Sequence, residues 1–392
     1  MAVNITWTDV PEAFDLPQNT AQLHLQPSLP APDYLTSHAF IEGDNYPVLQ
    51  KLLPAYKNSV NLIYIDPPYN TGNTFTYNDS FGEKGDYHSQ WLSFMARRLK
   101  LAQKILTESG CIFIAIDQAE LYALKLLCDG IFGEENFVND FMWLHGKGKK
   151  DSWSRTLQQH TLCYAKNKKQ LLPFKEIEFT DWAKTNADND PRGNWFSGSI
   201  SFSEKRSNPN HKNYYAIKSP SGIEWKRQWM CTKQEMEKLL SENKIYFGPA
   251  PEYKKVPRKK IFNEEPEEII PKNIIDCAAS TRKAAKHVDS LLNEKGVFDN
   301  PKPVDLICHL IKITRQPQNA IIMDFFAGSG TTFEAVCQLN QEDCGSRKCI
   351  LIQKAENPKK QITFNTISDL CWERIKKNCS QFKTDCNKYI LQ

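Results

Sequence analysis

The chain alternates short apolar runs with longer stretches in which apolar residues recur every three or four positions. The run Val60–Ile65 is apolar except for Asn61, and residues 111–116 are apolar throughout. Between these runs, residues 91–106 carry apolar side chains at the spacing of one helix face. Buried strands that alternate with amphipathic helices are typical of a parallel sheet with helices on both faces.

The same pattern predicts the other elements of the core. We expect further strands at 39–42, 141–144, 160–165, 320–324 and 348–353. We expect further helices at 46–53, 119–131, 281–292, 303–313, from 331 onward and at 367–380. Gly110 is expected to end the helix that begins near Trp91. The basic link between the strands at 141–144 and 160–165 predicts a hairpin at the sheet edge.

The alternation stops between residues 171 and 273, where aromatic residues mix with Asn, Ser, Gly and Pro and no long helix is predicted. We interpret this stretch as an inserted module, called the insert below. The first 38 residues are rich in Pro and polar side chains, which predicts a surface arm. The chain therefore divides into an arm (1–38), a core in two parts (39–170 and 274–392) and the insert (171–273).

Composition excludes several other classes of protein. Of the 392 residues, 40% are hydrophobic and 24% are charged, as in ordinary globular proteins. The formal charge of +4 permits an anionic partner without requiring one. The twelve cysteines form no C-x-x-C pair, so we predict neither a metal site nor a disulfide framework. Without a recognisable signal peptide or membrane-spanning run, we expect a cytoplasmic protein with no membrane contact.

A glycine-rich turn joins the strand at 320–324 to the helix from Thr331. It reads Asp324-Phe325-Phe326-Ala327-Gly328-Ser329-Gly330. Two glycines let the backbone approach a ligand, and the carboxyl end of a parallel strand is where such sheets bind cofactors. The third glycine of a dinucleotide site and the Gly-Lys of a P-loop are missing. A turn that packs tightly without a ligand is the alternative.

A second candidate site, Asp66-Pro67-Pro68-Tyr69, follows the run Val60–Ile65. Its prolines fix φ and remove two amide donors, so the loop is stiff and its carbonyls can accept hydrogen bonds. Asp66 and the Pro67 carbonyl could each accept one hydrogen of an amino group on a planar ring, while Tyr69 stacks on the ring. A rigid turn without chemistry is the alternative, and the separate glycine-rich turn makes it the weaker one.

The two motifs together suit one reaction, the transfer of a methyl group from a sulfonium to an exocyclic base amine. Such an amine is a poor nucleophile because its lone pair is conjugated with the ring. Two in-plane acceptors favour a pyramidal nitrogen that can attack. In-line positioning of nitrogen and methyl can supply roughly 7–11 kcal/mol, and no metal is needed.

With these motifs, the chain resembles the amino-methylating DNA methyltransferases of the beta class, in which the catalytic segment precedes the cofactor segment. It is most similar to the modification (Mod) subunits of type III restriction-modification systems. The matching stretches are residues 66–72, 91–99, 116–117, 132–137, 300–303 and 324–332. The resemblance implies an α/β fold: a Rossmann-like S-adenosylmethionine-dependent methyltransferase sheet with an inserted target-recognition region at 171–273.

The resemblance also implies roles for the two parts of the core and for single residues. Residues 39–170 would form the catalytic half, and residues 274–392 the cofactor-binding half with a closing helix. The residues that would bind S-adenosyl-L-methionine are Asp44, Asn70, Lys302, Pro303, Asp324, Phe326, Gly328, Gly330, Thr331 and Glu356. Asp44 would reach the adenine, or alternatively it only caps the following helix.

Basic and aromatic residues predict contacts with double-stranded DNA. Between Gly146 and Gln170 there are seven Lys or Arg residues and a single acid, Asp151. We expect phosphate contacts from this link and further contacts from the insert, made by Lys147, Lys149, Lys150, Arg155, Trp195 and Arg227. A solvated basic hairpin is the alternative for the link.

These inferences give one leading hypothesis, a site-specific DNA methyltransferase that flips adenine from duplex DNA and methylates its N6 by direct in-line transfer. The sequel Asn70-Thr71-Gly72 favours adenine over cytosine N4, which stays an alternative. A non-catalytic DNA-recognition subunit is a third reading. Methylation at cytosine C5 would need a cysteine nucleophile, typically after proline, and the chain has no Pro-Cys pair. The resemblance allows a homodimer and a restriction subunit as partners.

Overall fold

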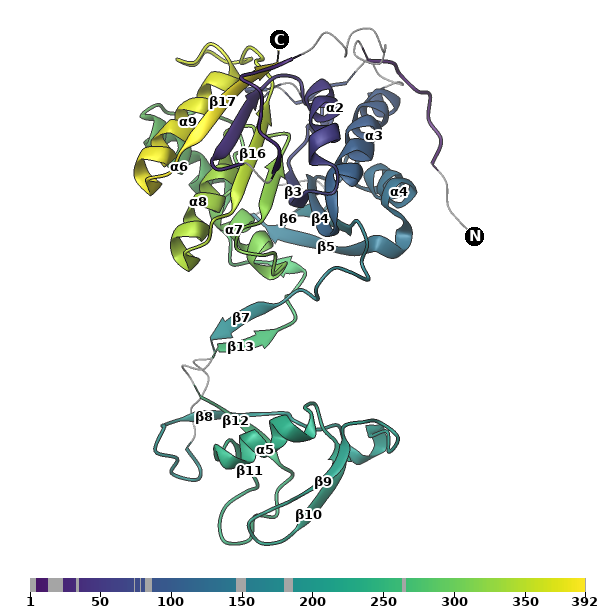
Figure 1. Ribbon diagram of the computed structural model, residues 1–392, viewed down its shortest axis with the longest axis vertical. Helices are drawn as coiled ribbons and strands as arrows, with labels where there is room; N and C mark the ends of the chain where they lie inside the picture. The colour runs from purple at the N-terminus through teal and green to yellow at the C-terminus, as the bar shows by residue number, and fades with distance from the viewer. Residues whose placement is uncertain are drawn as a thin grey trace. The chain divides into compact units, whose positions relative to one another are not determined.

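The chain folds into two compact units in the computed structural model (Figure 1). The core unit comprises Met1–Lys175 and Pro271–Gln392, and the second unit, Glu176–Ile270, lies within the predicted insert. The described residues are 5–12, 24–32, 35–73, 75–77, 79–81, 87–145, 153–179, 186–262 and 266–391. Among them, no helix has both the length and the apolar character needed to cross a bilayer.

A ten-stranded sheet forms the centre of the core unit. Six neighbouring strands run parallel, in the spatial order β17 (Cys386–Leu391), β2 (His38–Glu42), β16 (Lys348–Gln353), β15 (Ile321–Asp324), β3 (Val60–Ile65) and β4 (Leu106–Ile116). The remaining four are β1 (Leu25–Gln26), β5 (Phe137–Leu144), β6 (Gln158–Ala165) and β14 (Ile274–Ile275). This mixed α/β architecture confirms the predicted fold class.

The strands β5 and β6 form the predicted hairpin, but not at the outermost edge. β6 pairs antiparallel with both β4 and β5, and β14 pairs parallel with the other side of β5. The edge position therefore belongs to a two-residue strand from the second half of the core.

Helices cover both faces of the sheet, as Figure 1 shows. One face packs against α2 (Asn45–Tyr56), α3 (Tyr87–Ile105) and α4 (Leu121–Phe132). The other face packs against α7 (Val304–Ile313), α8 (Thr331–Asp343) and α9 (Ile367–Phe382). A further helix, α6 (Thr281–Leu292), contacts α9, and a short 3₁₀ turn, η2 (Glu134–Asn136), follows α4.

The strand order places the two sequence motifs at one edge of the sheet. β3 and β15 are neighbours, with Leu62 opposite Ile322 and Ile63 opposite Met323. Because the two strands are parallel, their carboxyl ends point the same way. Asp66 follows β3 directly and Asp324 ends β15, so both leave the sheet at the same edge.

Gly110 does not end a helix, contrary to the prediction. α3 stops at Ile105 and β4 begins at the next residue, so Gly110 lies inside the strand. The pairing of β3 with β4 is irregular here, and a Cβ on Gly110 would lie 2.9 Å from the Asn61 carbonyl oxygen. The glycine is therefore needed where the backbones approach closely and not as a helix stop.

The strand β17 was not predicted from the sequence. Of its six residues only Tyr389 is buried. It still pairs with β2 on one side and β1 on the other. A strand with one buried side chain gives almost no periodic signal, which explains the omission.

The second unit has its own small core around Trp229, Met236 and Phe247. Its strands pair antiparallel in three groups: β8 (Trp195–Gly198), β11 (Ile245–Tyr246) and β12 (Arg258–Phe262); β9 (Tyr214–Lys218) and β10 (Glu224–Gln228); β7 (Glu176–Phe179) and β13 (Pro266–Ile269). It also contains η3 (Glu204–Arg206) and a nine-residue helix, α5 (Lys233–Ser241), which begins with a capping box of Thr232 and Glu235.

Trp195 is a core residue of the second unit, so the prediction that it contacts DNA is wrong. Its side chain is 1% exposed, and its Nε1 donates to Asp188 Oδ1 at 2.9 Å. Beneath it, the buried Lys260 ammonium donates to Asp190 Oδ2 at 2.8 Å. An aromatic residue among basic ones looks like a DNA contact in the sequence, but here the strand alternation turns it inward.

Truncating Trp195 should therefore destabilise the second unit. We expect Trp195→Ala to lower the free energy of unfolding of this unit by about 3–5 kcal/mol, because a large buried ring is lost. Phe196→Ala, on the same strand and 40% exposed, is the matched control and should cost much less. Denaturant unfolding of the full chain measures both, and equal losses would contradict this placement of the two rings.

Candidate functional site

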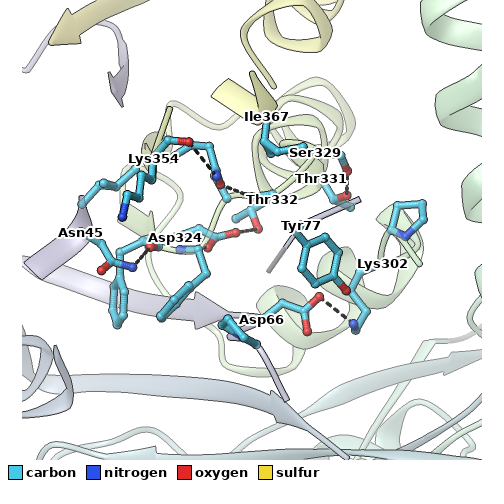
Figure 2. A pocket seen from close by; sticks show the side chains of 18 of the residues that line it. Asn45, Asp66, Tyr77, Lys302, Asp324, Ser329, Thr331, Thr332, Lys354 and Ile367 are labelled. Atoms are coloured by element: carbon cyan, nitrogen blue, oxygen red, sulfur yellow. Dashed lines mark hydrogen bonds and ion pairs between the residues drawn. The ribbon is translucent and has the colours of Figure 1, made fainter. Parts of the chain in front are cut away.

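A pocket lies at the carboxyl edge of the sheet, between the ends of β3, β15 and β16 and the start of α7 (Figure 2). Its volume of about 220 Å³ suits a small molecule rather than a single water. Nine of the residues predicted for the catalytic loop or the cofactor line it: Asp44, Asp66, Pro68, Lys302, Asp324, Phe326, Gly328, Thr331 and Glu356. The residues that were predicted but do not line it are Pro67, Tyr69, Asn70, Pro303 and Gly330.

The glycine-rich turn is organised around the Asp324 carboxylate. Its Oδ1 accepts from the Phe326 amide at 2.9 Å, and its Oδ2 accepts from Thr332 Oγ1 at 2.6 Å. Gly328 has φ +53°, and a Cβ there would lie 3.3 Å from the Phe298 ring. Its amide donates to Gln353 Oε1 at 2.8 Å, which ties the turn to the end of β16. A side chain on Gly328 would thus be strained and crowded.

Asp324 is held in an environment that favours its protonated form. Burial raises the pKa of this carboxyl from its ordinary 3.8 to about 7. The hydrogen bonds from Thr332 and from the Phe326 amide act in the opposite direction, and the nearby Asp66 charge raises the pKa further. Desolvation is the dominant cause, as expected for a carboxyl that is 3% exposed.

A buried arginine that no sequence motif singled out also holds the glycine-rich turn in place. Arg374 of α9 is 1% exposed, and its Nη1 donates to Ser329 Oγ at 2.9 Å and to Thr331 Oγ1 at 3.0 Å. Its Nη2 donates to Glu334 at 2.9 Å. Gly330 packs against the same helix: its φ is +83°, and a Cβ there would lie 3.2 Å from the Cys371 sulfur.

The Asp66 carboxylate faces the pocket and is paired twice. Its Oδ1 accepts from the Tyr69 hydroxyl at 2.5 Å, and its Oδ2 accepts from Lys302 Nζ at 2.6 Å. Figure 2 shows this ion pair with the Tyr77 ring beside it. Lys302 is 7% exposed and Asp66 26%. The ammonium also lies 5.2 Å from the centroid of the Tyr69 ring, so three predicted residues meet at one point.

The loop Asp66-Pro67-Pro68-Tyr69, called the catalytic loop after its predicted role, is held by contacts that could not be predicted from the sequence. Asp79 is 1% exposed and accepts from the Tyr69 amide at 2.6 Å and from the Thr71 amide at 3.0 Å. Trp91 Nε1 donates to the Pro68 carbonyl at 2.8 Å. The Pro68 carbonyl, which was predicted to be available to a ligand, therefore accepts a hydrogen bond that holds the loop on α3.

Asn70 does not point toward the cofactor-type pocket, which contradicts its predicted role there. It is 7% exposed, with φ +59°. Its Nδ2 donates to Glu120 Oε1 at 2.7 Å, and its Oδ1 accepts from the Phe81 amide at 3.2 Å. Pro303 likewise serves as the N-cap residue of α7 and does not line the pocket.

The residues present fit S-adenosyl-L-methionine. Its methionine end carries an α-carboxylate, an ammonium and a sulfonium, and the pocket offers a buried cation, Lys302, beside the acids Asp66 and Asp324. Tyr64 lines the same pocket, is 2% exposed, and its hydroxyl has no hydrogen-bond partner among the described residues. An unpartnered buried hydroxyl facing a cavity is what a bound polar ligand would satisfy.

The comparison with known proteins identifies the family. Residues 60–364, which include both motifs, match the family model for N6/N4 methyltransferases, described as DNA methylase. The chain belongs to the N6/N4 DNA methylase family. DNA methylases take their methyl group from S-adenosylmethionine, so membership of the family confirms the predicted class of cofactor.

Similar proteins include both types of modification enzyme. The "Type III restriction-modification enzyme StyLTI Mod subunit" of Salmonella typhimurium is 34% identical over 381 residues, covering 88% of this chain and 57% of that one. The "Type II methyltransferase M.KpnI" of Klebsiella pneumoniae is 30% identical over 384 residues, covering 87% of each. The solved PvuII DNA methyltransferase (cytosine-N4-specific) is 13% identical, with a TM-score of 0.45 over 90% of this chain and 95% of that one. The chain thus spans a little over half of the type III subunit.

In this DNA methylase, Asp44 caps a helix and also lines the pocket, while its contact with adenine stays a prediction. Its Oδ1 accepts from the Tyr46 amide at 3.0 Å and so caps α2. It also lines the pocket, with Arg98 Nη2 at 3.2 Å and Lys354 Nζ at 3.5 Å. Glu356 lines the same pocket, so two predicted cofactor-binding acids, Asp44 and Glu356, face one cavity.

Aromatic side chains outside the two motifs also contribute to the pocket. Tyr77 stacks on Phe298 with ring centroids 5.6 Å apart and an interplanar angle of 27°. Burial, followed by the charge of Asp66, raises the pKa of the Tyr77 phenol well above its ordinary value. Neither residue belongs to a recognisable motif, and only the fold brings them together.

The predicted DNA contacts have mixed outcomes. Lys147, Lys149 and Lys150 lie outside the described residues, and Arg155 is exposed. Arg227 is paired with Glu204 at 3.0 Å, and its side chain is only 11% exposed. The contact that remains open to DNA among the described candidates is therefore Arg155.

Replacing Asp324 with Asn should change how stability depends on pH. The folded protein keeps this proton up to about pH 7, whereas the unfolded chain releases it near pH 4. Folding therefore takes up a proton between these values, and the wild type should lose about 2–3 kcal/mol relative to Asp324→Asn as pH rises from 5 to 7.5. Denaturant unfolding at both values measures the difference. Asp305→Asn controls for the loss of one carboxylate, and parallel curves for wild type and Asp324→Asn would refute the shift.

Proposed function

We propose that this chain is a site-specific DNA methyltransferase that transfers the methyl group of S-adenosyl-L-methionine to adenine N6 in duplex DNA. The observation that carries the proposal is that Asp66 of the Asp-Pro-Pro-Tyr loop lines the same pocket as the glycine-rich turn. A base amine held at Asp66 would therefore lie next to a methyl donor in that pocket. Family membership supports methylation of an exocyclic amine, and the sequel Asn70-Thr71-Gly72 favours adenine.

The residues of the chain bind the cofactor, orient the base and accept a hydrogen bond from its amine. Bound S-adenosyl-L-methionine supplies an activated methyl group. As the N–C bond forms and the methyl–sulfur bond breaks, Asp66 would accept a hydrogen bond from the target amine, stabilise the positive charge that develops on the nitrogen, and receive the proton that the methylated amine loses. Tyr69 would stack on the flipped base, which contributes about 1–3 kcal/mol. Lys302 and the glycine-rich turn hold the cofactor's methionine end. In-line placement of nitrogen and methyl then lowers the barrier without a covalent enzyme intermediate.

We propose that the contacts of Asp66 rearrange when a base binds. Both oxygens of Asp66 are engaged, one by the Tyr69 hydroxyl and one by Lys302. Each carboxylate oxygen can accept a second hydrogen bond, so a base amine can bind to Asp66 beside these donors or in place of one of them. Tyr69 is the one that has to move for stacking, because its ring is half-buried and its hydroxyl is turned toward Asp66.

The partners follow from the relatives. We propose that the insert serves as the target-recognition region and that the basic link around Arg155 contacts phosphates. A restriction subunit as partner is supported by the names of the type III relatives, which are Mod subunits of restriction-modification enzymes. The match to a type II methyltransferase over 87% of each chain supports a chain that also acts without one.

Expression in a host without DNA methylation tests the function directly. Sequencing that distinguishes N6-methyladenine from N4-methylcytosine should find N6-methyladenine in one recognition sequence. The host carrying Asp66→Ala is the control and should show none. N4-methylcytosine would replace the adenine assignment with the alternative, and an unmodified genome would contradict methyl transfer altogether.

The Asp66–Lys302 pair gives a separate prediction about stability. Asp66→Ala should abolish methyl transfer and also leave the Lys302 ammonium buried without its carboxylate. The cost should be roughly 2 kcal/mol, below the 3–5 kcal/mol of a fully buried pair because Asp66 is 26% exposed. The double variant Asp66→Ala/Lys302→Met should recover most of this stability but no activity. Thermal unfolding and transfer of labelled methyl measure both effects, and a double variant less stable than Asp66→Ala would contradict the pairing.

A further inference from the structure

The side chain of Asn70 joins a polar cluster on the side of the catalytic loop away from the pocket. The cluster consists of Asn70, Glu120 and His88, which come from three different elements. Glu120 Oε1 accepts from Asn70 Nδ2 at 2.7 Å and is 2.6 Å from His88 Nδ1. A single carboxylate oxygen therefore links the residue after Tyr69 to the start of α3 and the start of α4.

Glu120 is an unusual position for a carboxylate with only a packing role. It is 1% exposed, and its second oxygen, Oε2, has no hydrogen-bond partner among the described residues. It directly precedes α4, but its side chain makes no capping hydrogen bond to that helix. Burial raises the pKa of its carboxyl, while the bonds from Asn70 and His88 lower it. Burying a carboxylate costs several kcal/mol unless its partners offset the cost. The contacts of Glu120 with Asn70 and His88 therefore have to stabilise it in this position.

Both contacts of Glu120 bear on the orientation of the catalytic loop. Asn70 has a left-handed backbone, φ +59°, directly after Tyr69. Its amide group is fully specified: Oδ1 accepts from Phe81 N, and Nδ2 donates to the Tyr87 carbonyl at 3.3 Å as well as to Glu120. The charge-assisted bond to Glu120 is the shortest of the three and fixes which way the amide faces.

We propose that Glu120 is a positioning residue for methyl transfer, which acts through Asn70 to hold Tyr69 and Asp66 in place. This inference rests on the proposed function of the loop. Glu120 lies outside the pocket lining, so its effect would be transmitted through Asn70. His88, whose side chain is 53% exposed, secures the carboxylate from the solvent side.

Three variants test the role in the full-length protein. Glu120→Leu removes the acceptor and should lower kcat roughly 10- to 100-fold, the effect of losing a hydrogen bond to a charged group. Its Kd for S-adenosylhomocysteine should stay within about twofold of wild type, because the pocket is untouched. Glu120→Gln keeps a carbonyl oxygen for Asn70 and should recover most of kcat. Asp129→Leu is the matched control on the same helix, since it breaks the contacts of Asp129 with Lys125 and Tyr164 without touching the loop.

A double-mutant cycle separates action through Asn70 from an independent effect. If Glu120 acts through Asn70, then Asn70→Ala/Glu120→Leu should be no slower than the slower single variant. Multiplied losses would overturn the proposal. So would a kcat for Glu120→Leu that falls no further than that of Asp129→Leu.

Hydrogen exchange tests the inference without any activity. The amides of Tyr69 and Thr71 should exchange faster in Glu120→Leu than in wild type or Asp129→Leu, because the loop loses one of its anchors. Equal exchange in Glu120→Leu and Asp129→Leu would reject the positioning role. If Glu120→Leu speeds exchange of these amides but the wild type transfers no methyl group, the proposed function is rejected, whereas the role of Glu120 in holding the loop is not.

Discussion

The parallel pairing of β3 with β15 is the interaction on which the site depends. It joins segments from opposite ends of the chain and makes their carboxyl ends neighbours. The Asp66-Pro67-Pro68-Tyr69 loop and the glycine-rich turn therefore both line one pocket. Their order in the sequence does not matter for this geometry, because a parallel sheet can be entered in any order provided that helices cross between the strands. Apolar packing on both faces of the sheet thereby fixes the placement of a few polar groups.

The electrostatics of the pocket follow from its position in that sheet. Asp66 and Asp324 stand at adjacent strand ends, where low solvent exposure would make two full charges repel strongly. The chain resolves this in two ways. Asp66 receives the buried ammonium of Lys302, whereas Asp324 receives only neutral donors and has its pKa raised to about 7. One acid is thus paired with a cation at the pocket, and the other serves to organise the turn.

Much of this could be predicted from the sequence, because the signals were local. Apolar runs located β3, β4 and β15, and the two motifs that follow β3 and β15 identified the pocket. The contacts of Arg374 with Ser329, of Asp79 with the Tyr69 amide, and of Glu120 with Asn70 could not be predicted, since each joins residues whose proximity exists only after folding. Trp195 was misjudged for a related reason: an aromatic residue's exposure depends on which face of its strand is buried.

The way in which the second unit joins the core has a consequence for the history of such chains. The chain leaves the core after Lys175 and returns at Pro271, and the strands that begin and end the excursion, β7 and β13, pair antiparallel with each other. The two crossing points are therefore neighbours, so the core closes its sheet without regard to what lies between them. Recombination could exchange the whole excursion for another of different length and leave the methylating machinery unaltered. With the proposed role of the insert in target recognition, such an exchange would change the recognised sequence while the pocket residues stay the same.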